Sequence, residues 1–209
     1  MHNRLIFEYH MKPSVFLNDM LTKGAILGAV MLASNIAENA MLCYGGTTTW
    51  LAVMSLEIIA SIALYIFLLR RFTRNYANLV LAERKTIPYF TYGNGLAYIV
   101  SVSMLAGVIV ALGNYMFVHY IVGFESYITG YVQTLKSAIS GTEMPSAMID
   151  TYEQMFKALE SQDEPSLISK VLSTVWSYLV GGTFVGIFIA ATTRRKADLF
   201  NNQNTQDNE

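Results

Sequence analysis

The sequence predicts an all-α protein, a bundle of four membrane-spanning helices with an amphipathic helical hairpin between spans three and four. Three observations lead to this fold class. Hydrophobic residues make up 53% of the chain and charged residues only 14%, against about 25% charged in soluble domains. Basic residues are segregated along the chain. Apolar runs of the ~20 residues needed to cross a bilayer occur four times, at 24–43, 50–69, 96–118 and 171–192.

Basic residues concentrate in three places and predict the topology. They gather before residue 24, in the segment 70–85 (RRFTRNYANLVLAERK), and at 194–196. The connection between the first two spans is uncharged, and residues 123–170 hold seven acids against three lysines. Loops rich in Lys and Arg stay in the cytoplasm. Both termini and the loop 70–95 are therefore expected in the cytoplasm, and residues 119–170 outside it.

The predicted organisation is one membrane domain with two flanking segments. Residues 1–23 form a cytoplasmic N-terminal segment, with translation starting at Met1 or Met11, and residues 24–193 form the membrane domain. The tail 194–209 has too little apolar content to fold and is expected to be disordered. No cleaved signal peptide is expected, because the first apolar run starts late and lacks a cleavage site.

The long outer segment carries helical periodicity on both sides of a Gly/Pro turn. Apolar residues recur three and four apart in ESYITGYVQTLKSAI and again in SAMIDTYEQMFKALES. This spacing predicts two amphipathic helices. Their acidic polar faces differ from the basic faces of helices that lie on membranes. Capping of the bundle or binding of a partner is therefore favoured over a membrane-surface role.

Polar residues at one depth form a predicted layer across the bundle. Counting along the helices places Glu38 and Glu57 each ~10 Å below the outer surface. Asn39 lies beside Glu38, and Asn114 falls at a similar depth, as do Ser177 and Tyr178. An ionised carboxylate there costs ~2–3 kcal/mol or more. The two glutamates are therefore expected to be protonated, to share a proton, or to bind a cation or water.

Two interpretations of this layer remain open. It is a proton- or cation-linked site, or it is a hydrogen-bonded seam that fixes helix register, with glutamates that reach toward the headgroups. The structural interpretation is favoured, since polar groups near an interface can find water.

Small residues predict close helix packing in the first and fourth spans. Such residues four apart let helix backbones approach each other in lipid. Gly24 and Gly28 continue the polar face of the first span, whereas Ala29 and Ala33 belong to an alanine stripe opposite it, and Gly182 and Gly186 form a GxxxG pair in the fourth. A helix with two such faces is expected to have neighbours on both sides.

No catalytic residue, cofactor or metal site is predicted. The chain lacks the motifs of serine hydrolases, zinc proteases and nucleotide-binding proteins, and Cys43 is its only cysteine. An enzyme is not expected, and nucleic acid is not an expected partner.

The arrangement resembles a known bacterial membrane-protein family. An apolar hairpin precedes RRFTRNYANL, the third span opens with TYGNGLAYIV, and the chain closes with VGGTFVGIFIAATTRRK. From about Lys12 to Lys196 this pattern is similar to the domain of unknown function 4199. The resemblance implies a location in the inner membrane of Gram-negative bacteria and brings no catalytic or binding residue.

The function predicted from these features is a non-enzymatic envelope protein. It lies in the lipid bilayer and acts through association, as a homo-oligomer or with a membrane-protein partner. The alternative is a small transporter or channel subunit that uses Glu38 and Glu57 for a proton or cation. A third interpretation is a membrane sensor whose outer hairpin binds a ligand.

Overall fold

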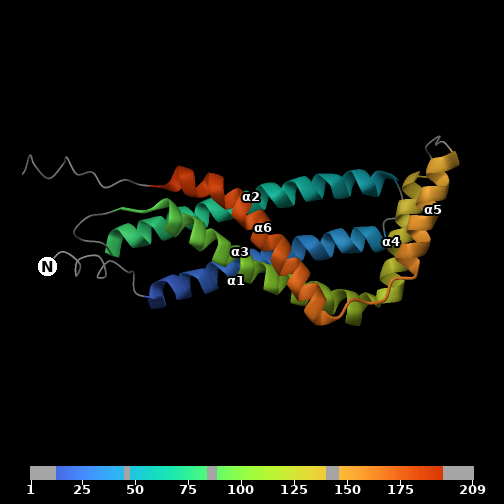
Figure 1. Ribbon diagram of the computed structural model, residues 1–209, viewed down its shortest axis with the longest axis horizontal. Coiled ribbons are helices and arrows are strands. Elements are labelled where there is room, and N and C mark those ends of the chain that lie inside the picture. Colours follow the sequence, from blue (N-terminus) through green and yellow to red (C-terminus); the bar gives the residue numbers. More distant parts are fainter. Residues whose placement is uncertain (1–12, 45–47, 84–88, 140–145, 195–209) are drawn as a thin grey trace, which may run out of the picture.

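The protein is a helical bundle with a helical cap at one end (Figure 1). The computed structural model describes residues 13–44, 48–83, 89–139 and 146–194. Four helices in this part are long and apolar enough to cross a membrane, which confirms a multi-pass membrane bundle. The elements are α1 (Pro13–Tyr44), α2 (Thr48–Glu83), α3 (Tyr92–Met116), the π-helical turn η1 (Phe117–Val122), α4 (Phe124–Ile139), α5 (Ser146–Glu160) and α6 (Leu167–Thr193).

Helix α3 forms the centre of the bundle. Half of its most apolar window is buried, against 6% for α2, and its most extensive contacts are with α6 and α1. Its buried face includes Ser103, Ala106 and Gly107. Side chains this small let neighbouring helices approach closely, which is how helices associate in lipid. Helix α2 lies at the edge of the bundle, where its apolar side chains remain exposed.

The basic segment expected in a loop is helical as far as Glu83, because α2 continues through it. The prediction of a connecting loop over 70–95 was wrong for its first fourteen residues. Phe72, Tyr76 and Val80 recur at helical spacing and are buried in the core. The neighbouring Arg70, Arg71 and Arg74 are exposed. This apolar stripe stabilises the helix beyond the apolar run.

The first helix also begins earlier than the apolar run that predicted it. It starts at Pro13, and proline suits the first helical position because its missing N–H has no partner there. Phe16 packs edge-on against Tyr76 and Tyr98, with ring centroids 5.8 and 6.3 Å apart. Residues 1–12 and the predicted tail after Arg194 lie outside the described residues.

Helices α4 and α5 form the cap, where the two amphipathic helices were predicted. Lys136 of α4 bonds Glu160 of α5 at 2.9 Å and lies over the Phe156 ring. Helix α4 docks on the end of α1 through the Thr134 hydroxyl, which donates to the Leu42 carbonyl at 2.7 Å. A Cβ on Gly130 would lie 2.9 Å from the carbonyl oxygen of Cys43, so glycine permits this approach.

Candidate functional site

A carboxyl group and two serine hydroxyls meet where α1 and α2 pack together. Glu57 and Ser61 lie one turn apart on α2, and the Ser61 hydroxyl donates to Oε1 of Glu57 at 2.7 Å. Ser34 of α1 donates to the same oxygen and also contacts the Ser61 hydroxyl. One carboxylate oxygen of Glu57 therefore receives two hydrogen bonds from two helices.

The second carboxylate oxygen of Glu57 differs from the first in its hydrogen bonding. Oε2 is buried and has no hydrogen-bond partner in the described part of the chain. A buried polar atom without a partner costs about 1–3 kcal/mol, and more when it is charged. A proton or a cation at this oxygen would relieve that cost.

Glu38 lies on α1 one turn beyond Ser34, at the wall of a cavity. It is partly buried and close enough to Glu57 for the two carboxyl groups to interact electrostatically. Two carboxyl groups that interact through a low-dielectric environment resist carrying two negative charges at once.

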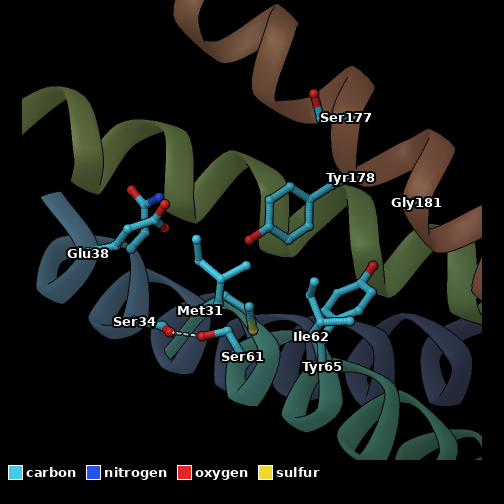
Figure 2. Close-up of a pocket in the computed structure, with 11 residues that line it drawn as sticks. Met31, Ser34, Glu38, Ser61, Ile62, Tyr65, Ser177, Tyr178 and Gly181 are labelled. Carbon is cyan, nitrogen blue, oxygen red and sulfur yellow. Dashed lines mark hydrogen bonds between the residues drawn. The ribbon is translucent and has the colours of Figure 1, made fainter. Parts of the chain in front are cut away.

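The cavity has a volume of about 330 Å³ and lies between α1, α2 and α6. Figure 2 shows Ser34 and Glu38 on one side of it and Tyr178 reaching in from α6. The rings of Tyr65 and Tyr178 meet edge-on with centroids 5.9 Å apart. The walls of the cavity are formed by Met31, Ser34, Asn35, Glu38, Ile58, Ser61, Ile62, Tyr65, Ser177, Tyr178 and Gly181.

A second polar group, centred on Asn39, joins α1 to α3 and to the cap. Asn39 Nδ2 donates to Asn114 Oδ1 at 2.8 Å and to Asn35 Oδ1 at 3.2 Å. Its own Oδ1 accepts from the Tyr127 hydroxyl at 3.1 Å. Asn39 is 6% exposed and Asn114 is 9% exposed, so these bonds are shielded from water. Asn39 is thus the residue through which three helices are connected.

The hydroxyl of Tyr127 keeps its proton across the physiological range. Burial, with smaller contributions from Cys43, Tyr131 and Glu38, raises the pKa of Tyr127 to about 12. This pKa lies above its ordinary value of 10. The protonated hydroxyl, which bonds Asn39, therefore stabilises the folded protein fully below pH 10, and this stabilisation is lost as the pH rises through about 12. The attachment of α4 to the layer is therefore insensitive to ordinary changes of pH.

Aromatic side chains pack together toward the end of α3 that is farther from the cap. Tyr76 and Tyr98 stack with centroids 4.1 Å apart, and Phe90 packs edge-on against Tyr76. The Tyr98 hydroxyl donates to Asp19 Oδ2 at 2.6 Å. Hydrogen-bonded polar groups thus connect the layer to the cap, whereas aromatic rings pack together toward the other end of α3.

The four residues predicted as a polar layer fall into two groups. Asn39 and Asn114 are bonded to each other, and Glu57 bonds serines at the interface of α1 and α2. Glu38 lines the cavity. Ser34, Ser61, Tyr65 and Tyr127 were not predicted. The spacing of four residues between Glu57 and Ser61, and between Ser34 and Glu38, is the signal that could have found the two serines.

Of the predicted packing residues, the glycines lie inside the bundle and the alanines lie on its surface. Gly24 and Gly28 lie against Leu105 and Ile109 of α3, and Gly182 and Gly186 also face α3. Ala29 and Ala33 are exposed on the surface of α1. The GxxxG pair of α6 thus packs within the chain, whereas the alanine stripe is available to an outside neighbour.

A larger polar pocket of about 820 Å³ lies beside the cap, where η1 and α4 meet the segment after α5. His119 Nδ1 and Glu164 Oε1 are 2.6 Å apart at its edge. Within the described residues, no group of three or more His, Cys, Asp or Glu is arranged to hold a metal ion.

Comparison with known proteins gives one relationship. A family model described as "Protein of unknown function (DUF4199)" matches residues 22–195. Searches of curated proteins and of solved structures found no match.

Proposed function

Because the chain belongs to the DUF4199 family, whose function is unknown, we propose a role from its own site: a proton- or cation-linked transporter or channel subunit. The observation that carries this proposal is the buried, unpartnered Oε2 of Glu57 in a membrane-spanning helix. The purely structural interpretation explains Oε1, which has two hydrogen bonds, but it leaves Oε2 without a role.

The surroundings of Glu57 favour a mobile positive charge over a fixed one. A charged carboxylate at the centre of a membrane helix costs about 2.5–3.5 kcal/mol. In the described part of the chain, the ion pairs lie in the cap, Lys136 with Glu160, and beside it, His119 with Glu164. No Lys or Arg is among the residues that line the cavity. A proton or cation is therefore the partner that would neutralise Glu57 or Glu38.

The position of the layer suits alternating access. Polar groups lead from it toward the cap through Asn39 and Tyr127, and the stacked Tyr76 and Tyr98 form part of an apolar core toward the other end. A transporter in which the site is reached from one side at a time needs one end closed while the other is connected. This arrangement supports transport over an open channel.

We expect Glu57→Gln to lower pH-driven cation or proton flux in proteoliposomes by roughly tenfold or more, because it removes the ionisable group. A tenfold change corresponds to about 1.4 kcal/mol. Glu38→Gln is expected to shift the pH dependence of the flux, because it removes the coupled carboxyl. Glu153→Gln, an exposed carboxyl of α5, is the matched control. Flux in the Glu57→Gln protein equal to that of the control would contradict the proposal.

The orientation we propose places both termini in the cytoplasm of a bacterial inner membrane, with the cap outside. The second half of α2, which carries Arg70, Arg71 and Arg74, runs away from α4 and α5 (Figure 1), and basic residues mark the cytoplasmic side. With Cys43 replaced by serine, a cysteine at Glu153 should react with an impermeant maleimide in intact cells. A cysteine at Asn78 should react only after lysis, and the reverse pattern would invert the topology.

Association remains a second candidate, which the exposed alanine stripe favours. Small residues four apart on an exposed helix face permit close contact with another helix, and Ala25, Ala29 and Ala33 are exposed on α1. In a chain lacking Cys43, a cysteine at Ala29 is expected to form a disulfide-linked dimer in native membranes. A cysteine at Leu56, on the exposed face of α2, is the control, and equal crosslinking at both positions would indicate random collision.

A further inference from the structure

The cavity between α1, α2 and α6 combines a carboxyl group with an aromatic and aliphatic wall. Glu38 lies on one side, and the edge-on pair of Tyr65 and Tyr178 lies on another. Aromatic rings attract cations through their negative faces, and more strongly where water is excluded. A simple proton site would need the carboxyl groups but no aromatic wall of this size.

The volume of the cavity also points beyond a proton or a small metal ion. About 330 Å³ lies within the range of pockets that hold small organic molecules, roughly 300–1,000 Å³. Such pockets are mostly apolar and carry a few polar groups that fix the ligand. Met31, Ile58 and Ile62 supply the apolar surface here, and Ser34, Asn35 and Glu38 supply the polar groups.

The cavity is open at the surface of the bundle, between α2 and α6. Three residues that line it, Ile62, Ser177 and Gly181, are exposed. The contact between α2 and α6 is much smaller than that between α3 and α6. Around this opening the exposed side chains are large and apolar, including Ile59 and Ile66 of α2 and Val180 and Phe184 of α6. Such a surface faces lipid in a membrane protein, so a ligand would enter from the bilayer.

The charged groups of the cavity determine which class of lipid-soluble molecule it can bind. Glu38 lines the cavity and Glu57 lies behind Ser34 and Ser61, with one buried oxygen unpartnered. No basic residue among the lining residues offsets them. An anion would be repelled once either carboxyl group is ionised, whereas a cation can take the place of the proton that otherwise neutralises it.

We propose that this cavity binds a lipid-soluble organic monocation, such as a quaternary ammonium or phosphonium ion, in exchange for a proton held by Glu38 and Glu57. One positive charge enters and one proton leaves, so the charge of the site is unchanged. The inference rests on the proposed proton-linked role of the two glutamates and adds the chemical class of the substrate.

The test uses the full chain in lipid nanodiscs, with tetraphenylphosphonium and tetrabutylammonium as probes and calorimetry as the readout. Tetraphenylborate, which has nearly the same shape as tetraphenylphosphonium and the opposite charge, is the control ligand. We expect saturable binding of at least one cation, no saturable binding of the anion, and weaker binding of the cation as the pH falls, because protons compete. Binding should release protons to the buffer.

Variants distinguish the contribution of the carboxyl groups to cation binding from that of the aromatic wall. Glu38→Gln and Glu57→Gln are each expected to weaken binding roughly tenfold, equivalent to about 1.4 kcal/mol. Tyr178→Leu is expected to weaken it roughly threefold or more, as loss of a cation–π contact does. Glu153→Gln should bind as the wild type does. Circular dichroism and gel filtration identify any variant that fails to fold, and the effect of pH on the wild type requires no variant.

Three results would overturn the inference. Neither cation binds saturably, or both tetraphenyl ions bind equally, or the two glutamine variants bind the cation as tightly as the wild type. If the cations fail to bind while Glu57 still exchanges a proton, the substrate class is wrong and the proton-linked role survives. If Glu57 exchanges no proton and no cation binds, both proposals fail.

Discussion

Replacing Gly182 with valine is expected to lower the free energy of unfolding by about 2–3 kcal/mol, the cost of overpacking a tight contact. A Cβ at this position would lie 2.4 Å from the Ser103 hydroxyl oxygen and 2.6 Å from the Ser103 Cβ. Helices α3 and α6 make the most extensive contact in the bundle, so they cannot separate locally without a wider loss. The Tyr65 hydroxyl, which bonds Ser103 at 2.9 Å, would also be displaced.

The neighbouring glycine provides the control. A Cβ on Gly181 would meet no atom within 4 Å, and the change in helix propensity from glycine to valine is the same at both positions. Gly181→Val is therefore expected to stay within about 0.5 kcal/mol of the wild type. Unfolding in mixed micelles, followed by circular dichroism, measures both. Equal stability of the two variants would show that α6 does not pack on α3 through Gly182.

Replacing Asn39 with leucine is the second large effect we expect, a loss of about 2 kcal/mol. The side chain makes three hydrogen bonds, to Asn114, Asn35 and Tyr127, and bonds of this kind in membrane proteins average about 0.6 kcal/mol each. Leucine has a similar size, so the loss comes from the hydrogen bonds rather than from a cavity. Buried Asn114 would in addition be left without this partner.

A double-mutant cycle isolates the contact between the two asparagines. Asn39→Leu and Asn114→Leu together should lower the free energy of unfolding by less than the sum of the two single changes. Either change alone already breaks the hydrogen bond between the two residues. Asn78→Leu, on an exposed part of α2, is the control. Strict additivity would mean that Asn39 and Asn114 act independently, and the link between bundle and cap would have to lie elsewhere.

The four spans could be predicted because each is an apolar run of bilayer length, and that signal does not depend on the neighbouring helices. Counting residues along the helices predicts one depth for Glu38 and Glu57, and this depth stays a prediction. Their partners could not be predicted, because hydrogen bonding between Ser34 and Glu57 depends on how α1 and α2 are rotated against each other. Charge counting along the chain carries no information on that rotation.

The end of α2 was misjudged for a different reason. The apolar run stops at Arg70, and a prediction based on membrane length stops there too. The stripe of Phe72, Tyr76 and Val80 was present in the sequence, but it is amphipathic rather than uniformly apolar. These residues bury themselves against Phe90 and Tyr98, which extends the bundle beyond the apolar span.

The glycines of α6 illustrate how an intramolecular contact can resemble an interface. Gly182 and Gly186 have the spacing of a helix-dimer motif, and sequence alone does not say whether the partner is another copy or another helix of the same chain. Both face α3 here. The stripe that remains exposed is the alanine stripe of α1, whose spacing is just as common in membrane helices.

The protonation state of Glu57 is the central quantity, and infrared titration of the carboxyl stretch in nanodiscs measures it most directly. We expect a carboxyl band that changes when a site cation is added, that is absent in Glu57→Gln and that is unchanged in Glu153→Gln. A spectrum in which Glu57→Gln removes no protonated band, and in which added cations change nothing, would contradict a proton- or cation-linked site and leave the Glu57 carboxyl a structural link between α1 and α2.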